Sequence, residues 1–211
     1  MSYHIPKTAG TSLRSALEAA YGWDAVFGCY RSTGAKALSA GKSVWLPRGT
    51  KVVHGHVRTH QNHHEIFPNA KRIVWVRDPV ERAWSMLTRL LARQDSHEPV
   101  YSVLKSRYID KGISDKAELF ECYLKDKQIS RFAFAYKLYF SAIPISDFDF
   151  VGSVHSMEDD MRRLSDVLNI ELSMHTRNRR TAGKDMPDAV WSLKPLFEDE
   201  YKIVAPYLRK D

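Results

Sequence analysis

Residues 4–12 are dense in chemical groups that suit a phosphate. The segment reads His-Ile-Pro-Lys-Thr-Ala-Gly-Thr-Ser and leads directly into an apolar pattern of helical spacing. Backbone N–H groups at the start of a helix lack intrahelical partners and lie at the positive end of its dipole, so they attract anions. The segment therefore predicts an anion-binding loop made by Lys7, Thr8, Ala9, Gly10, Thr11 and Ser12. An ordinary turn before a helix with a Ser or Thr N-cap is the alternative.

Arg77 and Ser85 form a second candidate pair. Arg77 directly follows the apolar run at 72–76, and Ser85 lies eight residues later, about two helical turns on. A guanidinium group and a hydroxyl group together can receive a phosphate. Taken alone, Arg77 could be a helix cap or a surface ion-pair residue, and Ser85 a small packing residue. Their occurrence together with the Lys7 loop favours a second phosphate site.

Residues 53–57 contain a pair of histidines, His54 and His56. Histidine titrates near neutral pH and can accept a proton from a hydroxyl group. A zinc site is the alternative, since three more histidines follow: His60, His63 and His64. The His-x-His motif of zinc hydrolases needs an aspartate at the position where this chain has Arg58. A cation beside Zn²⁺ is unfavourable. We therefore expect no metal, and expect those three histidines at a partly exposed start of a helix.

The pattern of apolar runs predicts a three-layer α/β fold with a central parallel sheet flanked by helices. Strands are expected at 3–6, 52–54, 72–76 and 150–153. Helices are expected from the Lys7 loop to about Tyr21, at 79–93, over most of 100–139, at 157–168 and from Asp188. In the 79–93 helix, Asp78 is the expected N-cap and Glu81 is expected to close a capping box. The helix from Asp188 is expected to direct Trp191, Leu193 and Phe197 into the core. Ligands collect at the carboxyl ends of such strands, where Lys7 and Arg77 fall.

Length and composition indicate one globular domain spanning residues 1–211. The net charge of +7 suggests an anionic partner. Nucleic-acid binding is not expected, because net charge is the only feature of the sequence that favours it. No apolar run approaches roughly 18 residues, so no transmembrane segment is expected. Cys29 and Cys122 are expected to be reduced thiols, which favours a cytoplasmic protein or a soluble part of a longer one.

The motifs together resemble sulfotransferases that use 3′-phosphoadenosine 5′-phosphosulfate (PAPS), nearest to the uronyl and heparan sulfate 2-O-sulfotransferases. Residues 4–12 resemble the 5′-phosphosulfate loop of that family. Residues 76–85 resemble its 3′-phosphate motif, with Arg77 and Ser85 in the binding positions. Residues 53–57 are similar to its double-histidine segment. Residues 179–184, followed by Pro187, resemble its cofactor-covering loop, which implicates Arg180, Thr181 and Lys184 in binding the nucleotide.

The resemblance implies a P-loop-NTPase-like sulfotransferase fold and in-line transfer of a sulfuryl group from PAPS to a hydroxyl group, leaving PAP and requiring no metal. A carbohydrate is the favoured acceptor, with an acidic glycan as one option. His56 is the favoured base with His54 in support, and Lys7 would stabilise the leaving phosphate. The segment after Ser85 lacks the aromatic run of the 2-O-sulfotransferases, and His4 replaces a basic residue, so the acceptor is less well defined than the donor.

A nucleotide kinase or NTPase-like phosphotransferase with the same anion-binding loop is the alternative function. Its Gly-x4-Gly-Lys-Ser/Thr pattern is absent here, because Lys7 precedes Gly10, the only glycine of the loop. An acidic Mg²⁺ ligand is also missing after the apolar run, where Val76 is followed by Arg77. Both departures favour sulfuryl transfer over phosphoryl transfer.

Overall fold

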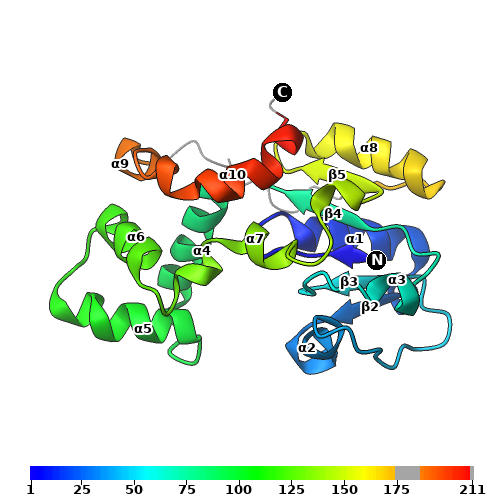
Figure 1. Ribbon diagram of the computed structural model, residues 1–211, viewed down its shortest axis with the longest axis horizontal. Helices are drawn as coiled ribbons and strands as arrows, with labels where there is room; N and C mark the ends of the chain where they lie inside the picture. Colours follow the sequence, from blue (N-terminus) through cyan, green and yellow to red (C-terminus); the bar gives the residue numbers. More distant parts are fainter. Residues whose placement is uncertain (174–185, 210–211) are drawn as a thin grey trace.

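The computed structural model of the protein describes residues 1–173 and 186–209. Within these ranges the centre is a five-stranded parallel sheet with the strand order β2-β3-β1-β4-β5 (Figure 1). The strands are β1 (Ser2–Tyr3), β2 (Val26–Cys29), β3 (Val52–Gly55), β4 (Ile73–Val76) and β5 (Phe150–Ser153). The sheet and its flanking helices confirm the predicted α/β class.

Helices connect the strands and cover the sheet. The α-helices are α1 (Gly10–Tyr21), α2 (Ala35–Leu38), α3 (His63–Ile66), α4 (Pro79–Arg93), α5 (Pro99–Arg107), α6 (Lys116–Lys125), α7 (Ala135–Tyr139), α8 (Met157–Leu168), α9 (Asp188–Trp191) and α10 (Glu198–Val204). Short 3₁₀ segments are η1 (Trp23–Ala25), η2 (Arg31–Thr33), η3 (Ile109–Lys111), η4 (Ser130–Phe132), η5 (Ile145–Asp147), η6 (Lys194–Phe197) and η7 (Ala205–Tyr207). None of the helices in the described ranges is both long enough and apolar enough to cross a membrane.

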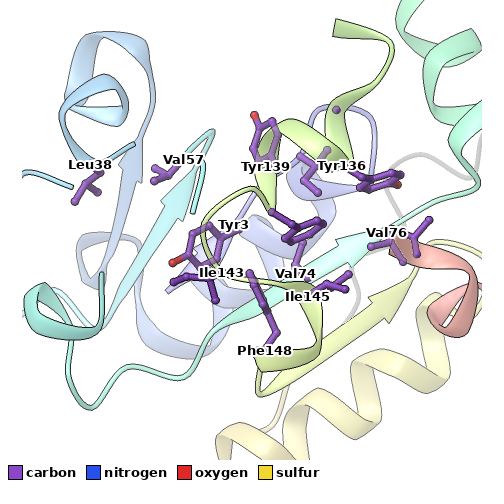
Figure 2. Close-up of a cluster of buried hydrophobic side chains, with 14 of the residues drawn as sticks. Tyr3, Leu38, Val57, Val74, Val76, Tyr136, Tyr139, Ile143, Ile145 and Phe148 are labelled. Atoms are coloured by element: carbon purple, nitrogen blue, oxygen red, sulfur yellow. The ribbon is translucent and has the colours of Figure 1, made fainter. Parts of the chain in front are cut away.

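Both faces of the sheet are buried, as the alternation of side chains along β4 shows. Val74 and Val76 belong to the apolar cluster on one face, where α2, α7, α10 and the 143–148 segment pack against the sheet (Figure 2). Ile73 and Trp75 belong to the cluster on the other face, where α1 and α8 pack. Because each face has its own set of helices, the strands are fixed between two layers and their carboxyl ends form one edge.

A second apolar core lies beside the sheet, where α4, α5, α6 and α9 pack together (Figure 1). The fully buried members include Leu87 of α4, Leu104 of α5 and Phe120 of α6. Helix α4 begins at the sheet and continues into this core. Its position is therefore fixed at both ends, which matters because it carries Ser85.

The structure differs from the sequence prediction at several elements. Strand β1 ends at Tyr3 rather than Pro6, because the following residues turn into the loop before α1. Strand β2 was not predicted; it is a four-residue edge strand that contains Gly28. The single helix expected from Asp188 is two helices, α9 and α10, separated by η6. Pro195 lies in η6, and proline cannot donate the hydrogen bond that a continuous helix needs.

Candidate active site at the carboxyl ends of the strands

The loop between β1 and α1 has a backbone conformation suited to an anion. Lys7 has a φ of 74° and Ala9 a φ of 58°, both in the left-handed region that side chains other than glycine rarely adopt. Such residues in a turn direct backbone N–H groups into a shared concavity that binds anions. Ala9, which has no side chain able to cap, is the N-cap of α1. The alternative of a Ser or Thr N-cap is therefore wrong.

Thr8 has a structural role within this loop. Its side chain is 1% exposed, and its Oγ1 donates a hydrogen bond to Ile5 O at 2.9 Å. The hydroxyl group therefore closes the turn from inside rather than facing a ligand. Lys7, Ala9, Gly10, Thr11 and Ser12 instead line the adjacent cleft.

His4 lies between the loop and the histidine pair. Its ring stacks on that of His54 with 5.0 Å between centroids, and lies 4.5 Å from the ring of His56. Gly10 is required here, because a Cβ on it would lie 1.9 Å from His4 Cδ2. Burial, followed by the neighbouring histidines and cations, lowers the pKa of His4 to about 2. His4 is therefore a neutral packing residue that joins the loop to His54 and His56.

His54 is buried beneath the site. It is 0% exposed, and its Nδ1 lies 2.8 Å from Ser2 Oγ. Burial first, and then the positive charge of Arg14, lowers its pKa to about 3. A neutral ring without access to solvent suits support of the site rather than proton exchange with a substrate.

His56 faces the cleft and is exposed to it. Its ring contacts those of His4 and Tyr30, the latter edge-on with 5.0 Å between centroids. Partial desolvation of the ring by the surrounding cleft walls and the positive charge of Arg89 both lower its pKa. The imidazole is therefore neutral near pH 7 and can accept a proton.

Arg77 and Ser85 line the same cleft, Arg77 at the end of β4 and Ser85 on α4. Tyr136 fixes the Arg77 backbone: its hydroxyl accepts from Arg77 N–H at 2.8 Å and donates to Arg77 O at 2.6 Å. The predicted N-cap of α4 is confirmed, because the Asp78 carboxylate accepts from the N–H groups of Val80 and Glu81.

The predicted capping box at Glu81 is wrong. Its carboxylate does not return to the backbone of Asp78; Glu81 Oε2 accepts from Arg77 Nε at 3.1 Å. The same oxygen lies 3.2 Å from His155 Nε2. Two cationic or potentially cationic side chains compete successfully with a backbone N–H for this carboxylate.

One cleft of about 1690 Å³ joins these residues. It is larger than a typical site for one small molecule, so it has room for a nucleotide and a second ligand. Among the described lining residues one side chain, Glu98, is acidic and seven are cationic: Lys7, Arg31, Arg58, Arg77, Arg89, Arg93 and Arg131. Of the predicted site residues, Thr8 and His54 lie behind the cleft wall. Arg180, Thr181 and Lys184 lie outside the described residues.

The strand order places these groups along one edge of the sheet. From β3 to β1 to β4, the carboxyl ends carry His56, the Lys7 loop and Arg77 in that order. Val154, which follows β5, completes the row and also lines the cleft. His56 and Arg77 therefore lie on opposite sides of the anion-binding loop.

The remaining histidines depart from the sequence prediction in one respect. His63 is 1% exposed, its Nδ1 lies 2.9 Å from Tyr3 Oη, and its Nε2 lies 2.8 Å from Leu38 O. The expectation of a partly exposed position is therefore wrong for His63. Over residues 1–173 and 186–209, no three His, Cys, Asp or Glu side chains are grouped as a metal site would require. Cys29 and Cys122 are both free thiols.

Comparison with known protein families places the chain in one of them. A family model described as the Sulfotransferase family matches residues 1–188 of the 211-residue chain. The model covers the anion-binding loop, the histidine pair, Arg77 and Ser85, but does not distinguish a 2-O-sulfotransferase subgroup. No curated protein and no solved structure matches the chain. The match over most of the chain shows that this protein belongs to the Sulfotransferase family and is a transferase of sulfuryl groups.

Proposed function

We propose that this protein transfers a sulfuryl group from PAPS to a hydroxyl group of an acidic carbohydrate, with His56 as the base. The observation that carries the proposal is that the Lys7 loop, the Arg77–Ser85 pair and the exposed His56 line a single cleft. In-line transfer of a sulfuryl group requires no covalent intermediate with the protein, because positioning of the reactants and electrostatic stabilisation account for most of the catalysis.

The residues of the cleft fit a nucleotide with phosphates at two places. The Lys7 loop has left-handed backbone positions and the uncapped start of α1, which suit the 5′-phosphosulfate. Arg77 and Ser85 suit the 3′-phosphate, and Arg77 has its backbone held by Tyr136. PAPS, when bound, supplies the sulfuryl group and leaves PAP as the product.

Two groups of the chain would act directly on the reaction. A ring nitrogen of His56 accepts the proton of the acceptor hydroxyl group as its oxygen bonds to sulfur. Lys7 and the N–H groups of the loop stabilise the negative charge that develops on the leaving phosphate. His54, which is buried, acts by holding His4 and through it the position of His56.

The acceptor side of the cleft favours an anionic molecule. His56 lies on the β2–β3 side of the loop, where Arg31 and Arg58 also line the cleft. Arg89 lines the cleft from α4, and its ion pair with Glu98 at 3.5 Å is partly exposed. Since Lys7 and Arg77 already account for the phosphates of the donor, these other cations would be available to carboxylate or sulfate groups of a glycan.

Ligand-induced thermal stabilisation tests the donor. At about 100 times its dissociation constant, PAP would add about 2.7 kcal/mol, which raises Tm by about 5–10 °C for a chain of this length. ATP with Mg²⁺ at equal concentration is expected to give a smaller shift. A larger shift with ATP and Mg²⁺ than with PAP would instead support the phosphotransferase alternative. Transfer from labelled PAPS to acidic and neutral glycans then tests the acceptor.

A further inference from the structure

Glu81 contacts two residues that come from different parts of the chain. Its Oε2 accepts from Arg77 Nε at 3.1 Å and lies 3.2 Å from Nε2 of His155, which follows β5. The three side chains are largely buried, with exposed fractions of 9% for Glu81, 13% for Arg77 and 22% for His155. The Arg89–Glu98 pair of the same cleft is longer, at 3.5 Å, and more exposed. The Arg77–Glu81 pair is therefore the more firmly held of the two.

The Glu81 side chain is ionised in this position. Burial raises its pKa, but the contacts with His155 and Arg77 more than offset this, and the pKa lies below its ordinary value. The carboxylate thus fixes the Nε edge of the Arg77 guanidinium, while Tyr136 fixes the Arg77 backbone. Arg77 is held at two points before any ligand arrives.

We infer that Glu81 is a positioning residue that orients the Arg77 guanidinium toward the 3′-phosphate of the nucleotide, with His155 holding the carboxylate from the β5 side. This inference rests on the proposed function, in which Arg77 receives that phosphate. The bond to Glu81 uses Nε, so the guanidinium presents its Nη groups to a ligand in the cleft. An arginine that is already oriented loses less side-chain entropy on binding than a free one.

The Glu81 carboxylate has a second, opposing effect, because its negative charge repels an anionic ligand. Two substitutions separate orientation from charge. Glu81→Gln keeps the length of the side chain and an oxygen that accepts from Arg77 Nε, but removes the charge. Glu81→Asp keeps the charge but is one methylene shorter and cannot reach both partners in the same geometry. Orientation therefore predicts that Gln preserves 3′-phosphate recognition and Asp does not.

The measurement is the ratio of dissociation constants for adenosine 5′-phosphate and PAP, which isolates the contribution of the 3′-phosphate. In Glu81→Asp we expect this ratio to fall by about tenfold, with the affinity for adenosine 5′-phosphate unchanged. In Glu81→Gln we expect the ratio to stay within about twofold of the unmodified protein. Glu121→Gln and Glu121→Asp are matched controls, because Glu121 makes an (i, i+4) ion pair with Lys125 on α6, outside the cleft.

Each other result overturns the inference in a recognisable way. A ratio kept by Asp and increased by Gln would show that only the charge of Glu81 matters. An equal loss of affinity for both nucleotides in both variants would show a general structural role. If the unmodified protein itself does not prefer PAP, the proposed function fails first. If Arg77→Ala removes the preference but Glu81→Asp keeps it, the proposed function stands and the inference fails.

Discussion

At the scale of single residues, His56 differs from its two histidine neighbours in access to solvent. Ring contacts join all three, but His54 is fully buried and His4 only partly exposed, whereas His56 is exposed in the cleft. Its ring contacts those of His4 and Tyr30, and both partial desolvation and the charge of Arg89 oppose formation of an imidazolium ion. His56 therefore combines access to a substrate with a neutral ring.

Removal of the imidazole should separate catalysis from donor binding. In His56→Ala we expect kcat to fall by at least about 10²-fold, because the base is lost. The affinity for PAP should change little, since the phosphate groups of PAP would contact the Lys7 loop, Arg77 and Ser85. Steady-state kinetics and calorimetric titration with PAP measure the two quantities. His60→Ala, which does not line the cleft, is the control; a kcat near normal in His56→Ala would exclude His56 as the base.

The pH dependence of kcat/KM provides an independent test of the same residue. A base must be neutral to act, and a lowered pKa keeps His56 neutral to lower pH. The acidic limb should therefore lie below the ordinary histidine value of about 6.5. Arg89→Gln removes a positive charge that disfavours the imidazolium ion. The acidic limb of the kcat/KM profile of this variant should therefore move toward higher pH. A limb that stays in place in this variant would show that another group controls the profile.

The contact between His4 and His56 could not be predicted from spacing along the chain. It depends on the parallel pairing of β1 with β3, in which Ser2 lies opposite His54 and Tyr3 opposite Gly55. The same offset brings His4 level with His56. A sequence shows which residues can form strands but not the register between strands that are 50 residues apart. The residue types of the site were therefore predictable, whereas the histidine cluster was not.

At the scale of elements, prediction succeeded where local chemistry decides the structure. Helix α4 begins and ends as expected, because Asp78 caps it and Pro79 suits its first position. Strand β4 is also found where an apolar, β-branched run predicted it, and β5 occupies the predicted residues 150–153. Strand β2 was not predicted, although its Val-Phe-Gly-Cys is much like the Phe-Val-Gly-Ser of β5, because local residue preference does not decide the structure of such short segments. It is a strand because it pairs with β3 along its whole length.

Helix α4 also carries a buried arginine that connects three elements of the site. Arg82 is 0% exposed, and its guanidinium donates to Pro6 O before the anion-binding loop and to Phe132 O and Ala133 O before α7. It also lies over the ring of Tyr136, with 5.8 Å from Cζ to the centroid. One side chain thus joins the loop, α4 and the segment that leads into α7.

Replacement of Arg82 should therefore weaken both the fold and the loop. In Arg82→Met the three carbonyl groups lose a charged donor, and we expect the free energy of unfolding to fall by about 2–4 kcal/mol. Arg82→Lys should recover only part of this, because one ammonium group cannot reach three separated carbonyl oxygens as a guanidinium can. Urea denaturation measures the change. A loss below about 0.5 kcal/mol in Arg82→Met would mean that the buried contacts do not stabilise the protein.

At the scale of the whole molecule, the sheet order gives one edge room for the two ligands of the proposed reaction. The central position of β1 places the Lys7 loop between the ends of β3 and β4. A nucleotide that spans the loop and Arg77 would occupy the β4 side, which leaves the β3 side, with His56, open to an acceptor. The net charge of +7 is concentrated in part in this cleft, where cations outnumber carboxylates seven to one among the described lining residues. Both the charge of the cleft and the strand order thus favour binding of a nucleotide on the β4 side and of an anionic acceptor on the β3 side.

The stability of the whole molecule should depend on pH because the fold opposes protonation of several groups, His4 and His54 among them. The pKa is about 2 for His4 and about 3 for His54, whereas both lie near 6.5 in the unfolded chain. Between these values the unfolded state binds protons that the folded state does not. The stabilisation is therefore complete above about pH 6.5 and is lost as the pH falls through this window. Each group contributes a loss of up to about 1.4 kcal/mol per pH unit.

Urea denaturation at pH 7, 6 and 5 measures this dependence, to which His4 and His54 together should contribute a loss of about 2–4 kcal/mol in the free energy of unfolding. His54→Gln removes one of these groups and should reduce the slope, while the Met1 amine and His63, whose pKa values are also lowered in the fold, keep part of it in place. Ser2→Ala is the control: it removes the 2.8 Å contact to His54 Nδ1 but leaves both histidines buried, so the slope should persist. Equal slopes in His54→Gln and the unmodified protein would show that His54 becomes protonated without unfolding.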